Sequence, residues 1–206
     1  GLPAPEELCR YAVEPDGTVT LTDRRTGRDF RRLIRYMDDG EIGDGWMHVR
    51  PAADSTVFSE GASCRVEMLY DGPAETAFRI TTMLRLPGRM DYDGGGIRRG
   101  GEWVTLPVAT TLRLGADNPF VDVETEVVNT AMDHRLRLLI PTDTESDTYL
   151  AGQAFALLTR PVGGMPETGD WKEPQLGDRN FDGIAARRNA LGEGLAFLSA
   201  FGLHEA

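Results

Sequence analysis

The sequence predicts an all-β fold, a large antiparallel β-sandwich, on three observations. Helical periodicity is nearly absent along the 206 residues. Short segments in which apolar and polar residues alternate follow one another, as expected of strands with one buried and one solvated face. The 24 glycines and 12 prolines lie between these segments rather than together in a linker. Many short strands with such turns are typical of two packed antiparallel sheets.

Turn sequences separate the alternating segments in order along the chain. The residues RTG at 25–27 and DGP at 71–73 each divide two alternating segments, and both favour tight turns. The expected strands outside the region 121–140 are residues 18–22, 30–36, 64–70, 78–86, 104–114, 154–159, 184–188 and 195–199.

The region 121–140 predicts a β-hairpin. In its first part valine or threonine alternates with acidic residues, and after a short turn leucine and isoleucine alternate in its second part. Pairing of the two parts places Glu124 and Glu126 near Arg135 and Arg137 on the outer face. Such cross-strand ion pairs contribute about 0.2–1 kcal/mol each.

Two stretches are expected to lie outside regular sheet. The first, residues 91–101, is rich in glycine and contains Arg98 and Arg99, which two readings explain: contact with an acidic substrate, or a solvated loop. It lacks the strand, helix and lysine of a phosphate-binding loop. The second, residues 163–179, is a long segment that predicts packing on another domain or shaping of a site.

Composition excludes several partners. A net charge of −11 disfavours nucleic acid and anionic membranes, and no apolar run approaches the ~20 residues of a transmembrane helix. Two cysteines, Cys9 and Cys64, are too few for a disulfide framework and predict free thiols in a reducing, cytoplasmic compartment. The start at Gly-Leu-Pro predicts an excised fragment, with residues 1–206 forming a single β-sandwich domain.

Four sequence segments carry a resemblance to a known family. They are DGTVTLTD at 16–23, DDGEIGDGW at 38–46, EVVNTAMDHRLRLLIPT at 126–142, and WKEP at 171–174 followed by GLHE at 202–205. In this order they resemble the C-terminal region of glycoside hydrolase family 38, the α-mannosidases and mannosylglycerate hydrolases. The resemblance implies the large supersandwich, similar to galactose mutarotase, that accompanies the catalytic domain. It also implies a bacterial retaining α-mannosidase as parent, with its nucleophile and its zinc in an N-terminal catalytic domain.

The acidic, glycine-rich loop at 38–46 is the predicted site. Carboxylates accept hydrogen bonds from sugar hydroxyls, and an indole packs on the apolar face of a pyranose. The resemblance implies that an aromatic residue here lines the mannose pocket; Trp46 occupies that position, where the family has Tyr. The predicted substrate-binding residues are Asp44, Trp46 and His48, the last because it alternates with Trp46 on one strand face. The alternative is that the acids are solvated turn residues and Trp46 is core.

The remaining histidines predict no metal site; a mutarotase-type role for His134, beside a glutamate of a neighbouring strand, is the alternative to a structural one. His134, at the exit of a turn, predicts a structural hydrogen bond, and His204 carries no interpretation. No HxH or HExxH spacing occurs in the sequence, so no metal and no cofactor is expected in this chain.

The sequence therefore predicts a non-catalytic β-sandwich domain that supports the catalytic domain of an α-mannosidase-like enzyme and is inactive alone. Its predicted partners are that N-terminal domain of the same chain and, in the parent, an α-mannoside. Two alternatives stay open: a stand-alone carbohydrate-binding module using the same loop, and a mutarotase-like sugar epimerase. One fold hosts all three functions, so the fold cannot choose among them.

Overall fold

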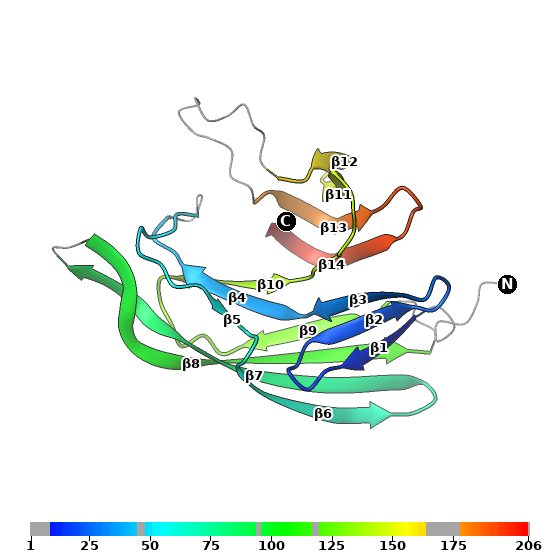
Figure 1. Cartoon of the computed structure of the whole chain (residues 1–206), viewed down its shortest axis with the longest axis horizontal. Coiled ribbons are helices and arrows are strands. Elements are labelled where there is room, and N and C mark those ends of the chain that lie inside the picture. Colours follow the sequence, from blue (N-terminus) through cyan, green and yellow to red (C-terminus); the bar gives the residue numbers. More distant parts are fainter. Residues whose placement is uncertain (1–8, 45–47, 94–95, 117–119, 164–177, 206) are drawn as a thin grey trace. The chain divides into compact units, whose positions relative to one another are not determined.

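The structure is a computed structural model that describes residues 9–44, 48–93, 96–116, 120–163 and 178–205. The described residues form strands and connections without a helix, and all paired strands run antiparallel (Figure 1). The all-β, antiparallel class is thus confirmed. In this part of the chain there is accordingly no helix of the length and apolarity that a membrane crossing requires.

The chain groups into two compact units, Gly1–Pro141 and Thr142–Ala206, and each is described by itself. The described part of the first unit has sheets of order β1-β2-β3, β10-β4-β5 and β6-β7-β8-β9. Its strands are β1 (Cys9–Val13), β2 (Val19–Asp23), β3 (Arg28–Leu33), β4 (Arg35–Gly40), β5 (Val57–Phe58), β6 (Ser63–Asp71), β7 (Glu75–Asp93), β8 (Gly96–Gly115), β9 (Asp122–Val127) and β10 (His134–Leu139). That residues 1–206 form a single domain stays a prediction.

The core of the first unit comes from alternation along β7 and β8. Their inward positions are at most 2% exposed: Ile80, Leu84, Leu86, Leu106, Val108 and Leu112. Each such buried side chain contributes about 1.5–3 kcal/mol relative to exposure. The four-stranded sheet that carries these residues is one layer of a sandwich, and the two three-stranded sheets form the other (Figure 1).

Aromatic side chains of the second layer close the sandwich over this core. Tyr11 of β1 packs edge-on against Phe78 of β7, with ring centroids 5.8 Å apart. The Tyr36 hydroxyl of β4 lies 2.5 Å from Thr110 Oγ1 of β8 and 3.2 Å from Thr125 Oγ1 of β9. Burial raises the pKa of Tyr36, although its hydrogen bonds with both threonines oppose that shift. These contacts fix β4 over the four-stranded sheet.

The predicted hairpin over residues 121–140 is wrong, although both of its strands exist. β9 pairs with β8 in one layer, and β10 pairs with β4 in the other. The connection between them bonds to both layers: the Val128 amide donates to Pro107 O (3.1 Å), and Asp133 O accepts from the Glu41 amide (2.9 Å). Alternation predicts a strand but not its partner, because every strand of a sandwich has the same period.

The ion pairs expected from that hairpin are wrong for the same reason. Glu124 pairs with Arg113 (2.9 Å) and Glu126 with Arg79 (2.5 Å), both within the four-stranded sheet. Arg137 instead points to a carboxylate of β4, described below. β9 is an edge strand, so its inward side chains, which the sequence predicted to be buried, remain exposed.

The described part of residues 91–101, namely 91–93 and 96–101, lies in paired strands and not in the predicted loop. β7 and β8 continue as a paired ribbon to Asp93 and Gly96. The glycines permit this pairing: a Cβ added at Gly100 would lie 2.1 Å from an oxygen of Asp91, and Gly101 has φ of 74°. The positive φ of Gly101 is the feature of this ribbon that favours glycine.

The predicted strand 30–36 is two strands in two sheets. The chain turns at Ile34, whose φ of 61° is unusual for a β-branched residue, and Arg32 has φ of 59°. This turn directs β3 to β2 and β4 to β10. It therefore sets the direction of β4, the strand that leads into the candidate site described below.

The described part of the second unit is one sheet of order β12-β11-β13-β14. Its strands are β11 (Thr148–Gln153), β12 (Ala156–Pro161), β13 (Asn180–Arg188) and β14 (Gly194–Glu205). A bulge at Gly183, with φ of 71°, shifts the register between β13 and β14. Gly152 packs so closely on this bulge that a Cβ would lie 1.9 Å from Asp182 O. Most of the predicted loop 163–179 lies outside the described residues.

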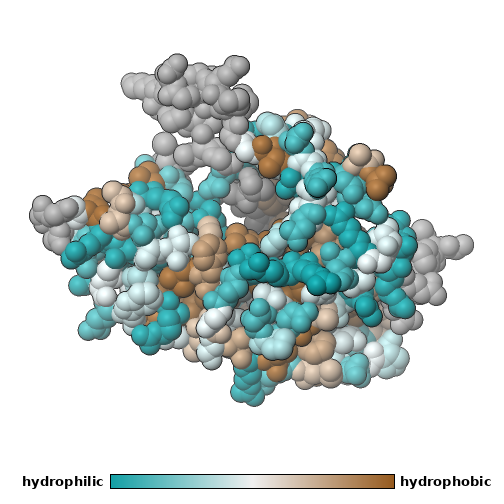
Figure 2. Space-filling model, in the orientation of Figure 1, coloured by the Kyte–Doolittle hydropathy of each residue, from teal (hydrophilic) through white to brown (hydrophobic). Residues whose placement is uncertain are grey.

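The face shown in Figure 2 is largely hydrophilic, with hydrophobic residues interspersed among the hydrophilic ones. Both cysteines are free thiols. Burial and the nearby Asp23 carboxylate raise the pKa of Cys9, and burial raises that of Cys64, so neither is an activated thiol.

Candidate functional site

The candidate site is the loop that follows β4, defined here as the 41–49 loop. Two backbone hydrogen bonds close its neck: the Glu41 amide donates to Asp133 O (2.9 Å), and the Ile42 amide donates to Val49 O (2.9 Å). The first ties the loop to the connection between β9 and β10. The loop thus starts and ends at fixed backbone positions of the first unit.

Glu41 organises the inside of this loop. Its Oε1 accepts hydrogen bonds from the amides of Gly43 (2.6 Å) and Val49 (3.0 Å), and its Oε2 contacts Nδ1 of His48. Burial acts to raise the pKa of Glu41, but the hydrogen bonds from the His48 ring and the two amides hold it below its usual range. The carboxylate is therefore ionised at neutral pH and joins both arms of the loop.

The two aspartates before the loop are not part of it. Asp38 and Asp39 end β4 and are 0% exposed, so the prediction that they belong to an acidic loop is wrong. Because successive strand residues point to opposite faces, the two carboxylates face different partners. An isolated buried carboxylate is very costly, and each of these is paired.

Asp38 joins three strands. It forms an ion pair with Arg99 of β8, and its Oδ2 lies 2.5 Å from Nδ1 of His134 on β10. Arg99 also donates to Ser55 O (2.8 Å) and Asp38 O (3.2 Å). His134 Nε2 lies 3.0 Å from Asn129 Oδ1, so the structural hydrogen bond predicted for this histidine is confirmed. The acidic-substrate reading of Arg99 is wrong, because its side chain is 1% exposed and bound to Asp38.

Asp39 faces the other side of β4. Arg137 of β10 donates to it at 2.5 Å, and Arg50 lies 3.7 Å away. Arg50 also pairs with Asp54 (2.9 Å), whose Oδ1 accepts from the Gly40 amide (3.0 Å). We call Asp38, Asp39, Asp54, Arg50, Arg99, His134 and Arg137 the buried ionic cluster. It fixes the last residues of β4 and hence the base of the 41–49 loop.

The predicted site residues are only partly placed. Asp44 is exposed on the 41–49 loop, and His48 is half-buried on its returning arm, bound to Glu41. Trp46 lies outside the described residues, as does the segment 171–174, and the side chain of His204 is not described. The structure thus brings His48 to Glu41, a residue the sequence analysis did not single out.

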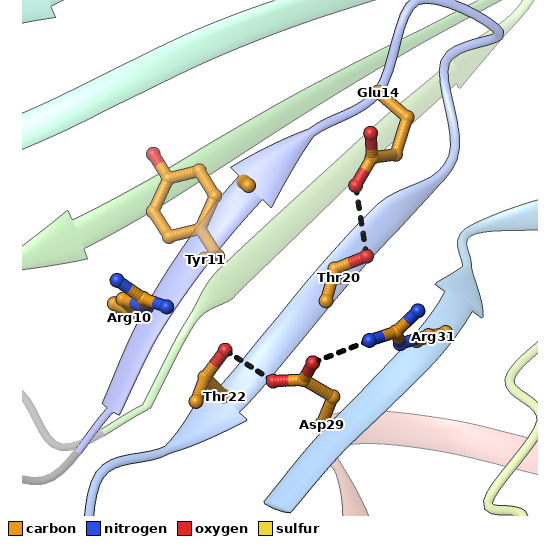
Figure 3. Close-up of a pocket in the computed structure, with 8 residues that line it drawn as sticks. Arg10, Tyr11, Glu14, Thr20, Thr22, Asp29 and Arg31 are labelled. Atoms are coloured by element: carbon orange, nitrogen blue, oxygen red, sulfur yellow. Dashed lines mark hydrogen bonds and ion pairs between the residues drawn. The ribbon is translucent and has the colours of Figure 1, made fainter. Parts of the chain in front are cut away.

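A separate depression lies on the outer face of β1, β2 and β3. It has a volume of about 470 Å³ and a polar lining (Figure 3). The lining groups bond to one another: Thr20 to Glu14 (2.9 Å), and both Thr22 (2.8 Å) and Arg31 (2.9 Å) to Asp29. These contacts describe a solvated sheet surface, so the 41–49 loop remains the better candidate.

The described residues form no candidate metal site. They contain no group of three or more histidine, cysteine, aspartate or glutamate side chains that could hold an ion. The carboxylates of the buried ionic cluster are bound by arginine and histidine instead.

The proteins that are similar to this chain in sequence and in structure are glycoside hydrolases by name. No family model matches the chain. The chain is 22% identical, over 97% of its length, to a protein of Halalkalibacterium halodurans named "Putative mannosylglycerate hydrolase". It is similar to the crystal structure of an α-mannosidase from Enterococcus faecalis (TM-score 0.79, 21% identity, 88% of this chain). A family 38 glycosyl hydrolase from the same species gives a TM-score of 0.77 at 21% identity and 88% coverage.

These similarities confirm the resemblance to family 38 found in the sequence, and they show that the chain has the fold of the corresponding part of those enzymes. The chain spans 23% of the curated relative and 22% of each solved structure. The relatives are therefore longer proteins, of which this region is a small part.

Proposed function

We propose that this chain is a non-catalytic β-sandwich region of an α-mannosidase-like glycoside hydrolase, supporting a catalytic domain of the same chain. The observation that carries the proposal is the shared fold: 88% of the chain matches an α-mannosidase with a TM-score of 0.79 yet accounts for 22% of that enzyme. In this proposal the parent hydrolyses α-mannosides with retention, and this region alone is inactive.

The buried ionic cluster supports a non-catalytic role. A retaining glycosidase needs two carboxyl groups about 5 Å apart that act from opposite sides of one bond. Asp38 and Asp39 point to opposite faces of β4, and each is already bound by cationic side chains. Zinc, which the family resemblance implies for the parent, does not fit the described residues, and we assign its ligands to the catalytic domain.

The 41–49 loop is the part of this region that we assign to the mannose pocket. Asp44, Trp46 and His48 supply a carboxylate, an indole and an imidazole within five positions of the sequence. Such groups bind sugar hydroxyls and the apolar face of a pyranose ring. The loop is closed by its own hydrogen bonds, which suits a subsite that must be held in place before the sugar arrives.

The test begins with the native gene product. Immunoblotting of the source cells should detect a protein several times larger than 22.6 kDa. That protein should hydrolyse an aryl α-mannoside in a zinc-dependent manner, and Trp46→Ala should lower kcat/KM while the matched surface variant Trp103→Ala leaves it unchanged. A native product of about 22.6 kDa would overturn the proposal.

One observation favours a second candidate, a stand-alone carbohydrate-binding module. Hydrogen bonds from the amides of Ile42, Gly43 and Val49 hold the two described arms of the 41–49 loop together at its neck. Calorimetric titration of the 206-residue chain with methyl α-mannoside separates the two candidates. Millimolar or tighter binding that Asp44→Ala abolishes would favour the binding module.

We assign either protein to the cytoplasm, in keeping with two unactivated free thiols.

A further inference from the structure

Glu41 uses both carboxylate oxygens within the 41–49 loop, and the three groups that it binds come from both arms. Gly43 lies two positions after it on the outgoing arm, while His48 and Val49 lie on the returning arm. Its side chain is 24% exposed, so these bonds are only partly screened by solvent. A single carboxylate thus bridges the loop across its neck.

The same contacts determine the tautomer of His48. An ionised carboxylate only accepts hydrogen bonds, so Nδ1 of His48 must carry the hydrogen that points at Glu41. In the neutral ring, Nε2 then carries the lone pair and is an acceptor. Nε2 is buried and has no hydrogen-bond partner among the described residues. In its neutral form, His48 therefore offers an acceptor, not a donor, at its second nitrogen.

We infer that Glu41 is a positioning residue for the 41–49 loop: it holds the neck closed and fixes His48 in the Nδ1–H form. It is not one of the residues assigned to sugar contact. The importance of this positioning for sugar recognition rests on the proposed function, whereas the positioning itself concerns only hydrogen bonds within this chain.

Two substitutions separate the two roles. In Glu41→Gln, the amide oxygen can still accept from the amides of Gly43 and Val49, but the amide NH₂ now faces His48. A donor in that place favours the Nε2–H tautomer of His48. In Glu41→Ala all three hydrogen bonds are lost. Glu67→Ala is the matched control, since Glu67 pairs with Arg65 on β6.

The experiment uses the 206-residue chain and NMR. Imidazole ¹⁵N shifts should report Nδ1–H for His48 in the wild type and in Glu67→Ala, and Nε2–H in Glu41→Gln. Amide exchange at Gly43 and Val49 should accelerate roughly tenfold or more in Glu41→Ala, because hydrogen bonds to a charged group are lost, and change little in Glu41→Gln. Nε2–H in the wild type, or unchanged exchange in Glu41→Ala, would overturn the inference.

A second readout keeps this inference distinct from the proposed function. In the full-length gene product, Glu41→Gln should lower kcat/KM for an α-mannoside, while Glu67→Ala should not. Expected NMR results with unchanged hydrolysis would support the positioning role of Glu41 and overturn the part of the 41–49 loop in the mannose pocket.

Discussion

The buried ionic cluster and the 41–49 loop contain acidic residues that are only a few positions apart in one sequence segment, yet these residues have different surroundings. Asp38 and Asp39 are 0% exposed and bound by arginines and a histidine of distant segments. The Glu41 carboxylate bonds only to groups of its own loop in the contacts described, and Asp44 is exposed. The first pair joins strands of the sandwich, whereas Glu41 of the second pair bridges the two arms of the 41–49 loop.

The difference follows from where the strand ends. As far as Gly40, β4 is flanked by β10 and lies over β8, so arginine side chains reach its carboxylates. Beyond Gly40 the chain leaves the sheet, and the partners described for the Glu41 carboxylate come from its own loop. The partners of these acidic residues therefore differ according to the side of this boundary on which the residues lie.

The largest effect should come from removing a partner of the buried ionic cluster. Arg99→Leu leaves Asp38 with His134 alone and should lower the free energy of unfolding by about 3–5 kcal/mol, the usual cost of breaking a buried ion pair. Urea denaturation measures this change. The exposed neighbour Arg98→Ala, on the same ribbon, should cost less than about 1 kcal/mol. Equal losses in the two variants would show that the cluster is not specifically stabilising.

A neutral hydrogen bond in the same region should cost less. Tyr36→Phe removes the hydroxyl that meets Thr110 and Thr125, and it should lower the free energy of unfolding by about 1–3 kcal/mol, since Thr110 is left buried without that partner. Tyr70→Phe, at an exposed position of β6, serves as control and should change stability by less than about 0.5 kcal/mol.

The 41–49 loop should respond to acid while the wild-type sandwich remains folded. The folded-state pKa of Glu41 is lowered, so its contribution is complete above the pKa of the unfolded state and is lost as the pH falls through the folded-state value. Amide exchange at Val49, corrected for intrinsic pH dependence, should therefore rise in acid in the wild type. Glu41→Gln should show no such rise; an identical profile in both would contradict the assignment.

The smallest effect should come from an exposed ion pair of the four-stranded sheet. Arg113→Ala removes the partner of Glu124, whose side chain is 61% exposed, and should change the free energy of unfolding by about 0.5 kcal/mol or less. Thermal or urea denaturation at low and high salt would measure it. If Arg113→Ala lowered the free energy of unfolding nearly as much as Arg99→Leu, burial would not explain the difference between the two ion pairs.

The sequence predicted what is local and missed what is not. Alternation of apolar and polar residues predicted β7, β8, β9 and β10, because the period of a strand depends only on its own residues. It missed β11, where alanine and glycine interrupt the pattern, and it paired β9 with β10, because pairing depends on the layer each strand enters.

The same limit applies to the candidate site. The sequence analysis singled out the loop for its acidic, glycine-rich composition and its resemblance to the family, and the structure describes Asp44 and His48 on it; their role in sugar binding stays a prediction. The burial of Asp38 and Asp39 was missed because Arg99 and Arg137 are 61 and 98 positions away in sequence. One available signal was the spacing of His134 and Arg137 on a strand, which supplies an imidazole and a guanidinium as partners for the two aspartates near the end of β4. Glu41 was missed because its partners are backbone amides and one ring nitrogen.

The most direct test is to compare Asp38→Ala with Asp44→Ala by urea denaturation under the same conditions. We predict that Asp38→Ala lowers the free energy of unfolding by about 3–5 kcal/mol, since Arg99 and His134 lose a buried partner, whereas Asp44→Ala changes it by less than about 0.5 kcal/mol. Similar values for the two variants would contradict the division between the buried ionic cluster and the 41–49 loop.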